Sequence, residues 1–226
     1  MKVLVVAAHP DDEVLGCGGT IPRLAREGDQ VYLAILGEGI TSRYDKRNDA
    51  DHSQLKALHN CCRRAAETLG VRDLFFHDLP DNRFDTVPLL DIVKIIEELI
   101  GSLSPEVVYT HHGGDLNIDH RLAQQAVLTA ARPTKGQPVR KIYSFEAPSS
   151  TEWAFQRIEP AFRPNLFVDI SATLPVKLKA LTCYESEIRA FPHPRSRAAV
   201  QATALRWGSV AGLEAAEAFE LIREVR

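Results

Sequence analysis

Short apolar runs alternate with amphipathic segments along most of the chain. The runs of strand length are KVLVVAAH (2–9), QVYLAILG (30–37), DLFFHDL (73–79), PEVVYTHH (105–112) and KIYSFE (141–146). Continuous runs rich in Val and Ile are typical of strands buried on both faces of a parallel sheet. We therefore predict a mostly parallel sheet, with NLFVDI (165–170) as a possible sixth strand.

Helical periodicity fills the intervals between these runs. The expected helices cover residues 14–27, 53–69, 87–103, 119–131, 173–189 and 195–224, the last broken near Gly208. Ser53 and Gly70 are residue types that begin and end helices. Strands and helices alternating at this spacing predict an α/β, Rossmann-like three-layer fold. We expect one domain over 1–226, in which 146–226 extends the core of 1–145 and completes the sheet and the substrate cleft.

Charge and composition exclude several classes of protein. The 226 residues carry 27 Lys and Arg against 30 Asp and Glu, a net charge of −3, with no basic run. Nucleic acid is therefore not expected as a partner. No apolar stretch approaches the ~18 residues of a membrane span. The four cysteines form no CxxC pair, so we expect reduced thiols and a cytoplasmic protein.

Candidate chemistry is concentrated in two segments that directly follow strands. AHPDDE (8–13) follows the first strand and THHGGDLNIDHR (110–121) follows the fourth. In doubly wound folds, ligands bind outside the carboxyl ends of the strands at the switch in strand order. Both segments carry side chains of the kinds that bind metals: His9, Asp11, Asp12, Glu13, His111, His112, Asp115, Asp119 and His120.

A His–His–Asp donor set drawn from the two segments predicts a catalytic metal centre. Three protein ligands with an open fourth position are typical of catalytic zinc, although nitrogen and oxygen donors also suit Fe²⁺, Co²⁺ or Mn²⁺. The alternative is that Asp11 or Asp12 only caps the helix that begins near Val14. That alternative explains neither His9 nor the doubled acid.

AHPDDE, together with the Asp–His pair after the fourth strand, resembles the PIG-L (LmbE-like) family of zinc-dependent de-N-acetylases. The order of elements agrees over about residues 1–145, and SSTEW and FPHPRS are similar to one subgroup of that family. The resemblance implies that His9, Asp12 and His120 bind the metal, with metal-bound water as the nucleophile. It also implies an LmbE-like fold, an N-acetylglucosamine-type amino sugar as substrate, and a possible homo-oligomer.

By the same resemblance, Asp11 is the general base and then the general acid that protonates the leaving amine. One departure concerns the oxyanion. Many members have His three residues before the last metal ligand, where this chain has Asn117. Asn donates a hydrogen bond but carries no positive charge, so we expect His111 or His112 to supply it, or else to be structural. Asp119 is expected to orient a metal ligand or to cap the following helix.

Four further residues are candidates for contact with the substrate. Arg43, in the polar loop 38–52, matches a family arginine that contacts sugar hydroxyls; its alternative is a solvated loop residue. Asp81 resembles a substrate-contacting acid, or else forms a turn with Asn82. His193 and Arg195, in FPHPRSR, are expected to bind a phosphate or carboxylate of the substrate, or else to lie exposed at a helix start.

Two rival functions follow from other features. GCGG (16–19) resembles a phosphate-binding loop and would indicate a nucleotide-binding protein, although these glycines are better explained by close packing of the first helix. The departure at Asn117 favours a non-catalytic sugar- or metal-binding module, whereas Asp11 speaks against it. The sequence therefore predicts a metal-dependent enzyme that removes N-acetyl groups from amino sugars.

Overall fold

Seven strands form a single sheet in this computed structural model, which describes residues 1–226 except for the side chain of Asn48. The strand order is β3-β2-β1-β4-β5-β7-β6. The strands are β1 (Lys2–Ala7), β2 (Gln30–Gly37), β3 (Asp73–Leu79), β4 (Val107–His111), β5 (Lys141–Phe145), β6 (Leu166–Asp169) and β7 (Ala216–Glu224). All neighbours from β3 to β5 pair in parallel, and β7 runs antiparallel to β5 and β6.

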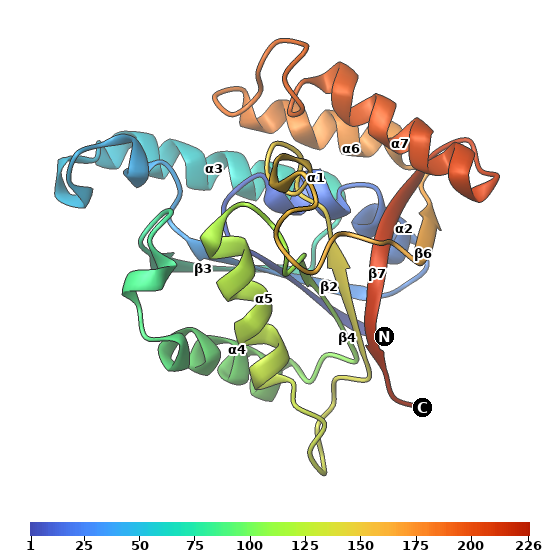
Figure 1. Ribbon diagram of the computed structural model, residues 1–226, viewed down its shortest axis with the longest axis horizontal. Coiled ribbons are helices and arrows are strands. Elements are labelled where there is room, and N and C mark those ends of the chain that lie inside the picture. The colour runs from blue at the N-terminus through green and yellow to red at the C-terminus, as the bar shows by residue number, and fades with distance from the viewer.

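Helices cover both faces of the sheet, as the three-layer prediction requires (Figure 1). One face carries α1 (Asp12–Cys17), α2 (Thr20–Arg26), α3 (His52–Leu69), α6 (Leu174–Leu181) and α7 (Arg197–Ala211), and the other carries α4 (Leu89–Leu103) and α5 (Ile118–Ala130). Strand β1 serves both layers, because Val3 and Val5 pack on one side while Leu4 and Val6 pack on the other. Among the described residues, no helix is long and apolar enough to cross a membrane.

The switch in strand order lies between β1 and β4. From β1 the chain moves outward through β2 to β3, and it then returns to the other side of β1 as β4. Residues 8–13 and 112–117 therefore leave adjacent parallel strands at the same edge. This topology brings together the two segments that the sequence singled out.

The predicted helix over 195–224 is wrong in its second half. Helix α7 ends at Ala211, where Gly212 adopts a left-handed backbone with φ of 73°, and β7 follows. The segment is rich in Ala and Glu, which favour helices. In the structure it alternates instead, with Ala216 and Ala218 against Trp207 on one face and Phe219 in the main core on the other. The hydrogen bonds of β7 to β5 on one side and to β6 on the other outweigh the local preference for helix.

Several predicted boundaries also change. The helix expected over 14–27 is divided into α1 and α2 at Gly18 and Gly19, and that over 173–189 ends as α6 at Leu181, followed by a 3₁₀ turn. Ser53 does not cap α3. Asp51 does so, because its side chain accepts a hydrogen bond from the Ser53 backbone N–H.

The glycines of GCGG are explained by packing. A Cβ atom at Gly16 would overlap the Phe145 ring on β5, and one at Gly19 would lie 2.7 Å from Ile170. Both positions need the close approach that only glycine permits. The first two helices consequently lie tightly on the sheet and on the segment after β6.

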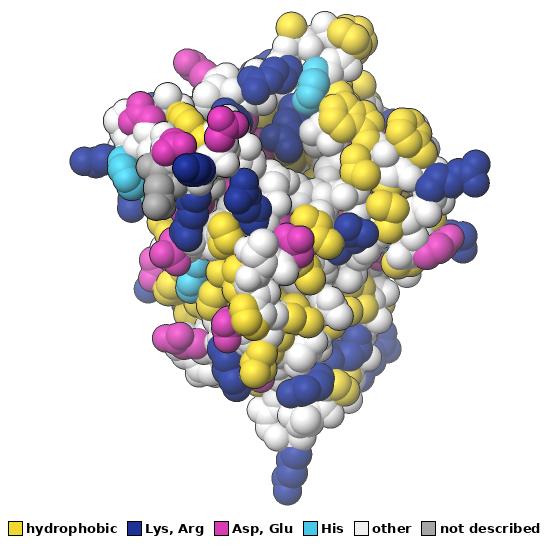
Figure 2. Space-filling model, turned by 60° about the vertical axis from the view of Figure 1, so that its left-hand side comes forward, with side chains coloured by type: hydrophobic (Ala, Val, Ile, Leu, Met, Phe, Trp, Pro, Cys, Tyr) yellow, Lys and Arg dark blue, Asp and Glu magenta, His cyan; other side chains and the backbone are white. Residues whose placement is uncertain are grey.

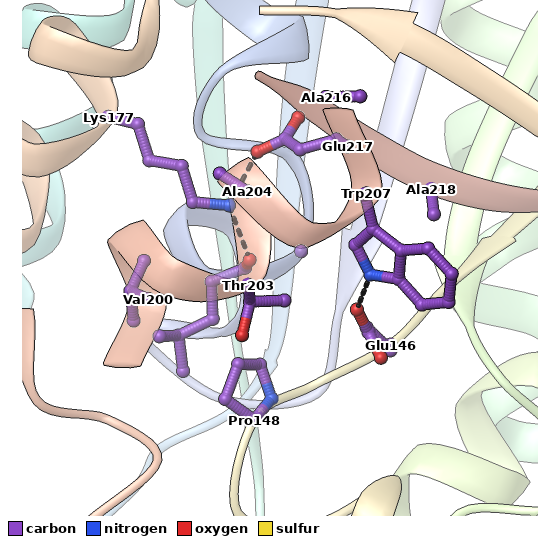
Figure 3. A pocket seen from close by; sticks show the side chains of 12 residues that line it. Glu146, Pro148, Lys177, Val200, Thr203, Ala204, Trp207, Ala216, Glu217 and Ala218 are labelled. Carbon is purple, nitrogen blue, oxygen red and sulfur yellow. Dashed lines mark hydrogen bonds and ion pairs between the residues drawn. The ribbon is translucent and has the colours of Figure 1, made fainter. Parts of the chain in front are cut away.

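A buried ion pair fastens the C-terminal strand to these helices (Figure 3). The Lys177 ammonium donates to Glu217 Oε1 at 2.5 Å and to the Leu15 carbonyl at 2.8 Å. Glu217 also accepts hydrogen bonds from the Gly19 and Thr20 backbone N–H groups and from the Thr20 hydroxyl. Each carboxylate oxygen of Glu217 is therefore satisfied, and the N-terminus of α2 is capped from β7.

Candidate active site

The predicted metal ligands come together at the switch point. His9 lies just after β1, Asp12 begins α1, and His120 lies in the first turn of α5. One ligand atom of each lies within 4.8 Å of the others. Asp12 Oδ2 is 3.5 Å from His9 Nδ1 and 3.3 Å from His120 Nε2. The three side chains thus converge from two segments more than 100 residues apart in sequence.

Three buried atoms of this group have no hydrogen-bond partner. They are Asp12 Oδ1 and the two ring nitrogens of His120. Burying a carboxylate oxygen without a partner is costly, and a bound cation removes that cost. The residues present therefore fit a divalent metal, and their nitrogen and oxygen donors suit Zn²⁺, Fe²⁺, Co²⁺ or Mn²⁺.

Each imidazole is supported from behind by a carboxylate. His9 Nε2 lies 2.8 Å from Asp119 Oδ2, and His120 Nδ1 lies 3.2 Å from Asp115 Oδ1. Asp115 is held in turn by the hydroxyls of Ser150 and Thr151. Such carboxylates fix the orientation of ligating imidazoles. Sequence reasoning assigned no individual role to Asp115, because no local signal distinguishes it from the other polar residues of its loop.

The charges of the site follow from burial and these neighbours. Burial tends to raise the pKa of Asp115, but the neighbouring His120 and the hydrogen bonds from Ser150 and Thr151 lower it to about 2. Burial would lower the pKa of His120, yet the carboxylates of Asp12 and Asp115 raise it to about 9. The pKa of Asp12 lies well below its usual value because His120 and His111 outweigh its desolvation. The carboxylates are therefore ionised at neutral pH, as metal binding requires.

Asp11 stands apart from the ligand group and lines a cavity of about 120 Å³. Its side chain accepts no capping hydrogen bond from α1, so the capping alternative does not hold for it. Instead, Arg195 Nη1 donates to Asp11 Oδ2 at 2.9 Å. Burial raises the pKa of Asp11 to about 7, although Arg195 opposes the shift. A carboxyl group with this pKa is suited to accept and return a proton near neutrality.

The backbone of Asp11 is strained, and a hydrogen bond to Glu13 holds it in place. Its φ of 102° is in the left-handed region, which costs a non-glycine residue roughly 1–3 kcal/mol. The Asp11 N–H donates to Glu13 Oε2 at 3.0 Å, and the Tyr184 hydroxyl contacts Glu13 Oε1 at 2.5 Å. Burial raises the pKa of Glu13 to about 8. Glu13 and Tyr184 thus hold the turn that aims Asp11 into the cavity.

Asn117 lines the same cavity and also begins α5. Its Oδ1 accepts from the Asp119 N–H, and its Nδ2 donates to Asn82 Oδ1 at 3.0 Å. Asn117, and not Asp119, is therefore the cap of this helix. Asp119 has a different task, because its Oδ1 accepts from the Phe84 N–H while its Oδ2 faces His9.

The expectation that His111 or His112 supplies positive charge at the cavity is wrong. His111 is fully buried, its Nε2 accepts from the Ala8 N–H, and burial lowers its pKa to about 3. It stacks on His120 at 3.8 Å between ring centroids, behind the ligand group. His112 places one ring nitrogen on Glu220 and the other on the Pro160 carbonyl. Neither histidine lines the cavity.

The candidate substrate residues divide into two groups. Arg43 and Asp81 line the cavity. Asp81 Oδ2 accepts from the backbone N–H and the hydroxyl of Ser42, so it also fixes the loop that carries Arg43. Arg43 in turn pairs with Glu187.

The expected anion clamp of His193 and Arg195 does not form. Arg195 lines the cavity, but its charge faces Asp11 and its Nε donates to Ser149. His193 is not among the cavity residues. Its Nδ1 accepts from the Arg195 N–H, and its ring packs edge-on against Trp153. The pairing of Arg195 with Asp11 spans 184 positions, so no local sequence signal indicates it.

With this geometry in place, known proteins give a clear assignment. Residues 4–131, more than half of the chain, match the family model PIG-L, described as GlcNAc-PI de-N-acetylase. The chain belongs to the PIG-L family. A diacetylchitobiose deacetylase of Thermococcus kodakarensis is 28% identical over 231 residues, covering 98% of this chain and 83% of that protein. The uncharacterized deacetylase YaiS of Escherichia coli is 29% identical over 190 residues, covering 81% and 90%.

A solved structure resembles this PIG-L member over all 226 residues. The 4-carboxy-2-hydroxymuconate hydratase GalB of Pseudomonas putida superposes with a TM-score of 0.79 at 22% identity, covering 100% of this chain and 97% of that one. At this identity the likeness shows the fold alone. The hydratase therefore shares its fold with this chain, whose sequence relatives are named deacetylases, and the reaction must be argued from the site.

Proposed function

We propose that this PIG-L member is a metal-dependent hydrolase that removes the N-acetyl group from an N-acetylglucosamine-type amino sugar or its conjugate. The relatives named as deacetylases and the family match support this class of reaction. One observation of the structure carries the proposal. A His–His–Asp group in which Asp12 and His120 are buried and have unpartnered ligand atoms lies next to an acid, Asp11, that stays outside the group.

In this proposal His9, Asp12 and His120 hold a divalent cation, which supplies Lewis acidity toward a water molecule and the acetamide carbonyl. Zinc is the proposed ion, with Fe²⁺, Co²⁺ and Mn²⁺ as alternatives. Asp119 and Asp115 keep the two imidazoles in their ligating orientations.

Asp11 takes the proton of the attacking water and passes it to the departing amine. Its pKa of about 7 suits both transfers. Arg195 fixes the carboxylate from one side, and Glu13 fixes the backbone from the other. We assign the donor for the developing oxyanion to Asn117 Nδ2, which reaches the cavity from the start of α5.

Arg43 and Asp81 are proposed to contact the hydroxyl groups of the sugar. Both line the cavity on the side of the loop after β2. Ser42, which precedes Arg43 in the chain, donates two hydrogen bonds to Asp81. These bonds fix the two residues on one side of the cavity before a substrate binds. A cytoplasmic location and a homo-oligomeric state remain predictions from the sequence.

Acetate and free amine released from a panel of N-acetylglucosamine conjugates test the proposal. We expect release by metal-replete protein, loss on chelation and recovery when Zn²⁺ is restored. Release that survives complete chelation would contradict the metal-dependent mechanism. Stoichiometric metal binding without release from any conjugate would contradict the assigned reaction.

A further inference from the structure

A second, larger cavity of about 460 Å³ adjoins the catalytic one. It lies between α3 and the segment that follows α6, and it shares Ile40, Arg43 and Leu58 with the catalytic cavity. The face of the molecule in Figure 2 is hollowed in its upper part, and Lys and Arg side chains lie beside the hollow. A substrate bound at Asp11 can therefore continue into this groove.

Arg64 supplies the groove with a cation that no acid neutralises by direct contact. Its Nη2 lies 3.3 Å from Cys61 Sγ and 3.4 Å from the Cys183 carbonyl. Among the ion pairs of the described residues, none includes Arg64, whereas Arg43 at the other end pairs with Glu187. Glu185 is the one acid in the lining, against these two arginines. An exposed guanidinium keeps N–H donors available for a ligand.

The position of Arg64 separates it from the reacting centre. Leu58 borders both cavities, and Arg64 follows six residues later on α3, about 9 Å along the helix axis. That distance exceeds the width of one sugar ring. A group bound by Arg64 is consequently a part of the substrate attached to the amino sugar, and not the sugar itself.

We propose that this groove binds the aglycone of the amino-sugar conjugate, and that Arg64 selects an aglycone bearing a carboxylate or a phosphate. The inference rests on the proposed function for the sugar end of the substrate. The sequence analysis expected Arg195 to bind an anion of the substrate, but Arg195 is paired with Asp11. We assign this role to Arg64 on α3 instead. Guanidinium groups bind both anions through paired hydrogen bonds, so the two chemistries share one site.

Three matched N-acetylglucosaminides test the selection: those of glycerol, glyceric acid and glycerol phosphate. We expect kcat/KM for the better charged glycoside to exceed that for the neutral one by about tenfold, the effect of one hydrogen bond to a charged group. Comparison of the carboxylate with the phosphate identifies which anion the groove takes. Equal kcat/KM for all three would overturn the proposal while leaving the deacetylase function intact.

Arg64→Gln should raise KM for the charged glycosides by the same factor, leave kcat unchanged, and leave the neutral glycoside unaffected. Arg63→Gln is the matched control, because the neighbouring Arg63 lies over the Phe76 ring and does not line the groove. An equal loss of kcat/KM for all three glycosides in Arg64→Gln would show that Arg64 has only a structural role, and would overturn the proposal.

Calorimetric binding of the three de-N-acetylated glycosides separates the groove from the reaction. We expect tighter binding of a charged product by wild type and loss of that preference in Arg64→Gln. If no glycoside is hydrolysed but this binding preference is present, the proposed function fails and the groove assignment stands. Equal affinities for the three products would overturn the groove assignment.

Discussion

Two buried charged clusters in this molecule differ in how completely their atoms are bonded. Glu217, beside Lys177, accepts four hydrogen bonds at the join between β7 and α2. Asp12, at the start of α1, leaves Oδ1 unpartnered, and His120 leaves both ring nitrogens unpartnered. Both carboxylates are 4% exposed or less. Burial therefore does not distinguish the two clusters, whereas the unused bonding capacity of Asp12 and His120 does.

The contrast extends to the backbone. The cluster around Asp12 contains a non-glycine residue with a left-handed conformation, Asp11, which is held there by Glu13. The Lys177 cluster caps a regular helix end. The cluster around Asp12 contains a strained backbone and unpartnered atoms, which we assign to metal binding. The Lys177 cluster contains neither. Changes in the first should affect metal and rate, and changes in the second should affect folding.

The largest effect is expected from His120→Ala. Removing this donor from the His–His–Asp group should abolish stoichiometric metal binding and reduce deacetylation to the level of chelated wild type. Metal analysis and acetate release check both outcomes. His193→Ala, outside the cavity, should keep its metal. Full metal occupancy in His120→Ala would remove His120 from the ligand set.

Lys177→Met should break the second cluster without touching the first. It leaves Glu217 as an uncompensated buried charge, a defect that costs about 3–5 kcal/mol of folding free energy. Urea denaturation measures this loss. The metal affinity of the folded variant should equal that of wild type, and a lowered affinity at unchanged stability would contradict the separation of the two clusters.

A smaller effect is expected from Asp115→Asn. The loss of the carboxylate behind His120 should weaken metal affinity by about 10–100-fold while the fold is retained. Competition against a chelator of known affinity measures the change. An unchanged affinity would show that His120 needs no support from Asp115.

The pH dependence should be the mildest effect. Asp11 has a raised pKa, so the carboxyl group is protonated below about pH 7 and cannot accept a proton there. kcat/KM should therefore rise with pH through about 7 and level off above it. Arg195→Gln removes the charge that lowers this pKa, and the rise should move to higher pH. An identical profile in the variant would contradict the coupling of Arg195 to Asp11.

Local patterns in the sequence predicted the parallel core and the polar segments after β1 and β4, whose side chains the structure brings together. Continuous apolar runs indicated β1 to β5, and AHPDDE placed its donors directly after a strand. Strand β7 was missed because alanine hides the alternation of its faces. The pairs Arg195–Asp11 and Lys177–Glu217 join residues 184 and 40 positions apart, and only tertiary packing brings them together.

The central claim is that Asp11 acts beside the metal ligands without being one of them. It is tested most directly by metal content and acetate release in wild type and Asp11→Asn, loaded and assayed side by side. We predict one equivalent of metal in both proteins and a kcat reduced by about 10²–10⁴-fold in the variant. An unchanged kcat in Asp11→Asn, or loss of the metal together with the carboxylate, would contradict the account.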